Sequence, residues 1–592
     1  MKKKCRAWKK TIIIFVIFIA GIFPAFAGET SRDKLTELEK NLDTKLLNWE
    51  QSLDGSHWEP YNPGQAIAAP VFHLRTSFQA PAVFAAKKVA GTPLGLKVKM
   101  SARGLALATF FMDDLQLEQA TIHGESGTSV ESSNEIALST QVDGRAHCLA
   151  ITVENHGFIP PRTAYWPERR RGVPEDEGSE FSLQSAELYF PAAEKSLGIL
   201  QKWLQAFQLA DTLLNPELKR YTFTGKPYDI PDKRVVARER LNRLNLSFDQ
   251  AVAALDWQAL TAGNWPKVQA SLQHSLRLAK TIKSYLGEFR ISLVGNAHID
   301  IAWLWRMAET MALSKNTYAT VIQNMGEYPE LTYAQSQAVT YDWIEKKYPE
   351  LFQQIREKVR AGRWEIVGGM WVEPDCNLIA GESWARQLLY GKKYLREKFG
   401  VDVRIGWNPD SFGYNWNMPQ LYKQSGIDSF ITQKLWWNDT TVFPHFLFNW
   451  QGVDGSTILT YMPPLSYASE LQLKEVANGI SKYEATTGSK ESLLLYGLGD
   501  HGGGPNREIL DRVRGYGALA LTPRFSHTTA GPFLQRQRKE KLDLPLWKDE
   551  LYLEYHQGTF TTQGAIKKNT RRTEALLSAT EKVSAIAHLL GG

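Results

Sequence analysis

The chain has 592 residues, more than one domain usually holds, and its 43% hydrophobic and 22% charged residues are ordinary for globular protein. The first 27 residues contain six of its 69 basic residues and no acidic one, so residues 28–592 carry 63 basic and 63 acidic residues. Without that segment the formal net charge is zero. No basic cluster indicates a surface that would follow a phosphate backbone, which argues against nucleic acid as a partner.

The first residues have the pattern of a secretory signal peptide. MKKKCRAWKK is basic, TIIIFVIFIAGIF is apolar, and Ala25-Phe26-Ala27 is a small-x-small cleavage pattern. The apolar run is shorter than the roughly 20 residues that a membrane span needs. We therefore expect cleavage after Ala27, export to the periplasm or the medium, and no stable membrane insertion afterwards. An uncleaved anchor is the alternative.

The next 260 or so residues change character twice. Residues 28–56 have apolar positions at helical spacing, as do residues 194–286. Between them, residues 57–192 hold short alternating segments separated by Gly, Pro and Asn, a pattern typical of a β-sandwich. We expect an N-terminal β-sandwich accessory domain with flanking helices over residues 28–285. Only Cys148 and Cys376 follow the signal segment, so no disulfide scaffold is expected.

A strand–helix alternation begins near residue 286. Apolar strands are predicted at 291–295, 364–368, 401–406 and 493–497, with helical patterns between most of them. Such alternation predicts an α/β catalytic domain over residues 286–545, built on a mostly parallel sheet or a distorted β/α barrel. Helical periodicity resumes after about residue 562. We interpret residues 546–592 as the incomplete start of a helical bundle domain.

Polar and aromatic residues follow each predicted strand, where ligands bind in parallel sheets and barrels. His298 and Asp300 are two residues apart, so in an extended segment both side chains point to one side. An imidazole nitrogen and a carboxylate oxygen are typical Zn²⁺ ligands. Asp410, after the third strand, is the best candidate for a third ligand. Further candidates follow the second and fourth strands: Trp371, Glu373, Asp375, Asp500 and His501.

Each fragment also has a simpler interpretation. A lone His-x-Asp pair is usually a hydrogen-bonded pair, and the Asp of NPDSFG is most often a turn residue. GDHGGGP could be a flexible loop. The chemical interpretation is favoured because all these groups follow strands of one α/β region.

Several longer motifs carry a family resemblance. HIDIAWLWRMAET, GGMWVEPDCN, WNPDSFGYNWNMPQLYKQSGI, KLWWNDTTVFPHFLFNWQGVDGS, GDHGGGP and ELYLEYHQGTFTTQ stand between about residues 285 and 585. In kind and order they resemble motifs of the α-mannosidases of glycoside hydrolase family 38, most closely its bacterial branch. The resemblance implies a retaining exo-α-mannosidase that acts on terminal mannose of glycans or oligosaccharides, with one Zn²⁺ or other divalent cation per chain in the sugar site.

The resemblance also implies individual roles. His298 and Asp300 match the family's first two metal ligands, and Asp410 matches the residue that is both metal ligand and catalytic nucleophile. Trp303 and Phe412 match positions that line the pocket for the terminal mannose. Asp500 is the candidate general acid/base, with Glu373 and Asp375 as rivals. Trp371, Asp375 and His501 are candidate substrate contacts.

One departure from the family pattern bears on function. The family's fourth metal ligand is a histidine of a His-Asp pair beyond the catalytic domain, and residues 560–592 contain no such pair. We expect either a C-terminally truncated chain or His501 in that role. The alternatives are an inactive glycan-binding remnant and a metal-dependent carbohydrate deacetylase. Linkage preference and oligomeric state stay open.

Overall fold

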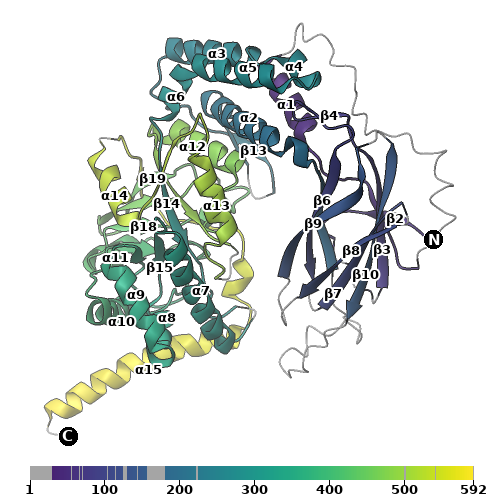
Figure 1. The fold of residues 1–592 in the computed structure, drawn as a ribbon. Helices are drawn as coiled ribbons and strands as arrows, with labels where there is room; N and C mark the ends of the chain where they lie inside the picture. The colour runs from purple at the N-terminus through teal and green to yellow at the C-terminus, as the bar shows by residue number, and fades with distance from the viewer. Residues whose placement is uncertain are drawn as a thin grey trace. The chain divides into compact units, whose positions relative to one another are not determined.

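The structure is a computed structural model (Figure 1). It describes residues 30–590 except 55, 66, 68, 70, 103–104, 114, 124–129, 143–144, 157–180, 222–223, 304, 499–501 and 541. The predicted signal peptide lies outside the described residues. The chain forms two compact units, Met1–Leu204 with Phe248–Ala279 and Gln205–Ser247 with Lys280–Gly592. Within the described part, the helices are too short or too polar to cross a bilayer.

The first unit is dominated by antiparallel strands. One sheet has the order β2 (Glu59–Tyr61), β1 (Trp49–Ser52), β3 (Val71–Gln79), β10 (Ala146–His156), β7 (Leu105–Met112), β8 (Leu115–His123), and a second has the order β11 (Phe181–Tyr189), β6 (Pro93–Ala102), β9 (Val130–Gln141). A short ribbon joins β4 (Val83–Phe84) to β5 (Lys87–Lys88). Burial alternates along β3, and the ring of Phe72 in β3 lies 5.5 Å from that of Phe181 in β11. The two sheets therefore share apolar contacts, as the alternating sequence pattern predicts.

The helix predicted over residues 28–56 is wrong in its second half. Helix α1 (Ser31–Leu42) starts with a capping box between Thr30 and Asp33, but the chain is extended at Asp43. Trp49 is buried in β1 and pairs with Tyr61 of β2. Leu46 and Trp49 are thus buried although the chain there is not helical, and this tertiary burial outweighs the helical spacing.

Helices follow the β region, as predicted for residues 194–286. They are η2 (Pro191–Ala193), α2 (Glu194–Leu214), α3 (Arg238–Ala253), α4 (Trp257–Thr261), α5 (Trp265–Leu278) and α6 (Lys280–Leu286), interrupted by the paired strands β12 (Lys219–Tyr221) and β13 (Pro227–Asp229). The expected boundary at residue 285 does not coincide with the division into units. Residues 205–247 belong to the second unit because β12 packs against it. The buried guanidinium of Arg220 in β12 lies 3.2 Å from the ring centroid of Trp436 and 4.6 Å from that of Phe446.

The second unit contains two largely parallel sheets. In one, β14 (Arg290–Asn296) pairs in parallel with β15 (Tyr333–Gln335), β21 (Glu491–Tyr496) and β22 (Arg524–His527), and β15 pairs with β16 (Trp364–Ile366). The other has the order β17 (Ile405–Trp407), β18 (Ser429–Ile431), β20 (Thr457–Tyr461), β19 (Leu447–Gln451), β23 (Leu546–Trp547), with only β19–β20 antiparallel. This arrangement agrees with the predicted α/β class and mostly parallel pairing.

Helices accompany these strands along the chain. They are α7 (Met307–Glu327), α8 (Ala338–Lys347), α9 (Pro349–Arg360), α10 (Gly381–Phe399), α11 (Met418–Gln424), η3 (Lys434–Trp436), α12 (Leu473–Thr487), α13 (Arg507–Tyr516), α14 (Ala530–Lys539), η4 (Gln557–Phe560) and α15 (Gly564–Leu589). The strand predicted at 401–406 begins only at Ile405. Several strands of three to five residues, such as β15 and β18, were not predicted because they are too short to establish a period.

One apolar core joins the two sheets. Val294 of β14, Ile405 of β17 and Leu493 of β21 belong to the same buried cluster, with Tyr461 of β20. The Tyr461 hydroxyl donates to the Leu493 carbonyl at 2.8 Å and accepts from the Leu493 N–H at 2.9 Å. The strands that precede the predicted site residues are therefore held in one packed core.

Glu484 of α12 should make the stability of this core depend on pH. The residue is buried, neither carboxylate oxygen has a hydrogen-bond partner among the described residues, and burial raises its pKa from 4.5 to about 7. Because the folded state then binds the proton more tightly than the unfolded state, stability falls as pH rises from about 4.5 to about 7. We expect this fall to lower the free energy of unfolding by about 2–3 kcal/mol in the wild-type protein and to be absent in Glu484→Gln. Urea unfolding of both proteins at about pH 5 and about pH 8 measures this; an equal pH dependence in the two would contradict it.

Candidate active site

The loop after β14 carries His298 and Asp300. The described residues of this loop have no regular structure up to Arg306, and α7 begins at Met307. The Trp305 indole N–H donates to the Asp300 carbonyl at 3.3 Å, and the Thr310 hydroxyl donates to the Ile301 carbonyl at 3.0 Å. These bonds tie the loop to the first turn of α7. The His298 side chain is thereby held in a buried position.

The loop after β17 carries Asp410 at a bend. Asn408 is fully buried; its carbonyl accepts from the Tyr414 hydroxyl and its side-chain oxygen from the Tyr422 hydroxyl, both at 2.8 Å. Gly413 has φ +105°, a conformation that residues with a Cβ rarely adopt. The residues that made a turn interpretation attractive form bends at 409–410 and 412, and Asp410 lies at the first of them.

The two loops bring three predicted ligands together. The Nε2 atom of His298 lies 3.1 Å from Asp300 Oδ1 and 3.7 Å from Asp410 Oδ2. One ligand atom from each of the three residues lies within 4.8 Å of the others. Ligand atoms about 2.0–2.2 Å from a shared cation are separated by about 3–4 Å. The donor set and its spacing therefore fit a divalent metal.

The charges around His298 suit cation binding. Burial lowers the pKa of this imidazole, but Glu373, Asp300 and Asp410 together raise it to about 9. Burial raises the pKa of Glu373 to about 7, against the opposing effect of His298. The site thus concentrates three acids around one imidazole, and a metal that binds there would replace the imidazole proton.

Lys434 is a site residue that sequence reasoning did not identify. It lies in η3 after β18, is buried, and its ammonium contacts the Asp410 carboxylate. The same ammonium lies 3.6 Å from the ring centroid of Trp437. KLWWNDT was recognised only as a motif, because a lysine in sequence gives no sign that it will be buried against a carboxylate.

Aromatic rings form one side of the site. Trp303 is 43% exposed, its ring lies 5.9 Å from that of Phe412, and the His556 ring lies 4.7 Å from Phe412 and 5.7 Å from Trp437. We call Trp303, Phe412, Trp437 and His556 the aromatic wall. Trp303 and Phe412, which the family resemblance assigns to the sugar pocket, lie beside each other. His556 was not predicted; it comes from the motif ELYLEYHQGTFTTQ.

Other predicted site residues lie differently. The Trp371 ring packs edge-on against Tyr394, with centroids 5.7 Å apart. Asp375 caps its own turn, since its Oδ1 accepts from the N–H groups of Asn377 and Leu378. Among the described residues, the side chains of Trp371 and Asp375 form no hydrogen bond, ion pair or ring contact with the three candidate ligands.

Asp500 and His501 lie outside the described residues, but their flanks are fixed. The Leu498 N–H donates to the Gly504 carbonyl at 2.7 Å, and the Thr317 hydroxyl donates to the Gly502 carbonyl. Gly497 leaves no room for a Cβ against the Asn296 carbonyl. The GDHGGGP loop therefore starts and ends beside the end of β14.

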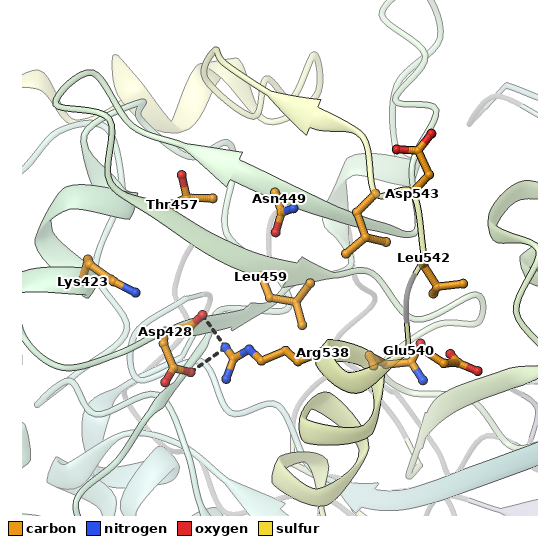
Figure 2. Close-up of a pocket in the computed structure, with 11 residues that line it drawn as sticks. Lys423, Asp428, Asn449, Thr457, Leu459, Arg538, Glu540, Leu542 and Asp543 are labelled. Carbon is orange, nitrogen blue, oxygen red and sulfur yellow. Dashed lines mark hydrogen bonds and ion pairs between the residues drawn. The ribbon is translucent and has the colours of Figure 1, made fainter.

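A polar groove of about 680 Å³ lies elsewhere on the second unit (Figure 2). Asp428, just before β18, and Thr457, at the start of β20, line it together with Arg538 of α14, which pairs with Asp428 at 2.6 Å. These positions are at the amino ends of the strands, whereas His298 and Asp410 follow carboxyl ends. None of the predicted site residues that the structure describes lines this groove.

Comparison with known proteins identifies the domain that holds the site. The glycosyl hydrolases family 38 N-terminal domain matches residues 288–550. The chain is 35% identical over 395 residues to Alpha-mannosidase G of Dictyostelium discoideum, covering 64% of this chain and 36% of that protein. It is 38% identical over 308 residues to Alpha-mannosidase of Saccharomyces cerevisiae, covering 50% and 28%. The crystal structure of an alpha-mannosidase from Enterococcus faecalis aligns with 44% of this chain and 31% of its own, at 18% identity and a TM-score of 0.38.

The chain spans about a third of the length of the curated relatives it matches. The matched region contains β14, β17 and β21 and all three predicted ligands. Residues 288–550 of this chain are therefore similar to the N-terminal domain of the family 38 glycosyl hydrolases.

Proposed function

We propose that this chain is a retaining exo-α-mannosidase that hydrolyses terminal α-linked mannose from glycans or oligosaccharides. The observation that carries the proposal is the meeting of His298, Asp300 and Asp410, from two loops far apart in sequence, next to the aromatic wall. Mannose as the sugar is supported by relatives whose names are alpha-mannosidase.

The metal in this proposal is one Zn²⁺ or another divalent cation per chain. His298, Asp300 and Asp410 would hold it. When bound, such an ion supplies positive charge and a template for sugar hydroxyls. The choice of Zn²⁺ rests on the mixed nitrogen and oxygen donors, which other divalent ions also accept.

The protein's own groups perform the reaction in two steps. Asp410 attacks the anomeric carbon while an acid, which we assign to Asp500, protonates the leaving glycosidic oxygen. This breaks the glycosidic bond and forms a glycosyl ester on Asp410. The conjugate base of the acid then takes a proton from water, which displaces the ester and releases mannose. Lys434 supports this assignment, because its buried ammonium contacts the Asp410 carboxylate.

The sugar ring would lie against the aromatic wall. Trp303 and Phe412 offer apolar faces to ring carbons, and His556 and Trp437 extend that surface. Trp371, Asp375 and His501 remain proposed contacts to more distant parts of the substrate.

Location and architecture complete the proposal. The basic and apolar composition of residues 1–27 supports export to the periplasm or the medium. We further propose that the two sheets of the second unit form one distorted barrel, supported by their shared core, and that those of the first unit form a sandwich.

The proposal is tested with 4-nitrophenyl glycosides. We expect release of nitrophenol from the α-mannoside but not from the α-glucoside, a loss of at least about tenfold after EDTA treatment and recovery on adding Zn²⁺. Release of acetate from acetylated oligosaccharides without cleavage of the mannoside would instead indicate a deacetylase. Mannose binding by calorimetry without turnover would indicate a glycan-binding remnant.

A further inference from the structure

Glu373 is tied to both loops that carry the candidate ligands. Its backbone N–H donates to Gln337 Oε1 at 3.1 Å, and the Gln337 amide donates to the carbonyl of Ile299 at 2.7 Å. Its side-chain Oε1 accepts from the hydroxyl of Ser411 at 3.0 Å. Ile299 lies between His298 and Asp300, and Ser411 follows Asp410. Glu373 is therefore fixed relative to all three ligands at once.

The second carboxylate oxygen of Glu373 faces the imidazole of His298. Oε2 lies 3.7 Å from His298 Nδ1, whereas Nε2, on the other edge of the ring, faces Asp300 and Asp410. The Glu373 side chain is only 10% exposed, and Oε2 has no hydrogen-bond partner among the described residues. An acceptor is thus available for Nδ1–H on the edge that points away from the ligand group.

This juxtaposition has a chemical consequence. A histidine binds a metal through one nitrogen as a neutral imidazole, and an acceptor for the other N–H selects that tautomer and fixes the ring. We infer that Glu373 is the positioning residue for His298: its Oε2 is the acceptor that faces Nδ1–H, so that the Nε2 lone pair is directed toward the metal position. The inference rests on the metal centre of the proposed function.

The same geometry argues against Glu373 as the general acid. Its Oε1 is engaged by Ser411 and its Oε2 lies at the ring edge opposite to the one that Asp410 faces. A proton donor in a retaining enzyme must instead reach the glycosidic oxygen beside the nucleophile. Glu373 acts through His298, and Asp500 keeps the acid role.

The test compares Glu373→Gln with Glu484→Gln, a matched change at a buried glutamate whose neighbouring charges are those of Lys490 and Arg234. Zn²⁺ affinity is measured by competition with a chromogenic chelator, without substrate. We expect Glu373→Gln to weaken Zn²⁺ about 10–100-fold, Glu484→Gln to bind like wild type, and Glu373→Asp to recover part of the affinity. At saturating Zn²⁺, kcat of Glu373→Gln should return to within a few-fold of wild type.

Each other outcome is decisive. Wild-type affinity in Glu373→Gln overturns the inference, as does an equal loss in Glu484→Gln, which would indicate general destabilisation. Unchanged affinity with kcat lost at saturating Zn²⁺ would make Glu373 the general acid. A Glu373-dependent Zn²⁺ site in a protein that releases no mannose would refute the proposed function and leave this inference intact.

Discussion

Replacement of Asp410 by asparagine is expected to lower kcat for 4-nitrophenyl α-mannoside by at least about 1,000-fold. The amide keeps the shape of the side chain but is not a nucleophile that can form the glycosyl ester. It also removes the negative charge that contacts Lys434 and faces His298. Initial rates at saturating substrate, with Zn²⁺ in excess, measure the effect.

A matched control is Asp342→Asn on α8, which removes the charge that pairs with the exposed Lys346 at 2.8 Å. Such pairs contribute at most about 1 kcal/mol to stability, so activity should stay close to wild type. Trapping with a slow fluorinated mannoside should add mass to the wild-type protein and none to Asp410→Asn. Near-normal turnover by Asp410→Asn would rule out Asp410 as the nucleophile.

Replacement of Gly391 by alanine should abolish stable folding of the second unit. Gly391 lies in α10, and a Cβ there would lie 2.6 Å from the backbone nitrogen of Trp371 and closer still to the carbonyl oxygen of Gly369. Backbone atoms cannot rotate away as a side-chain end can, so the helix must shift. We expect a loss above about 4 kcal/mol, measured by urea unfolding. The segment that leads to Glu373 would move with the helix.

Gly326→Ala in α7 is the control for this effect. A Cβ at Gly326 meets no atom within 4 Å, so the substitution should add up to about 1 kcal/mol of stability by reducing the freedom of the unfolded chain. Opposite signs for the same substitution in two helices would show that close packing, and not glycine itself, sets the outcome. Equal stability of Gly391→Ala and wild type would disprove the packing argument.

Whether a helix or strand was predicted correctly depended on how many of its residues carried the apolar periodicity. Long helices such as α9 and α10, and the buried strands β14 and β21, have enough periodic residues to be recognised. Residues 49–52 were assigned to a helix because their spacing continued that of α1, yet Trp49 is buried by strand pairing. The pairing partner, Tyr61, lies outside the segment that carried the helical spacing, so that spacing gave no sign of it.

The sequence by itself determined the residue types of the site and their order after strands, because metal ligation needs imidazole and carboxylate groups and parallel strands end on one side. Only the tertiary structure decided which groups meet. Lys434 against Asp410, Glu373 against His298, and His556 beside Phe412 join residues from loops that are adjacent only when the strands share one core. Charge and burial at a residue depend on these neighbours, so its role cannot be read from its own segment.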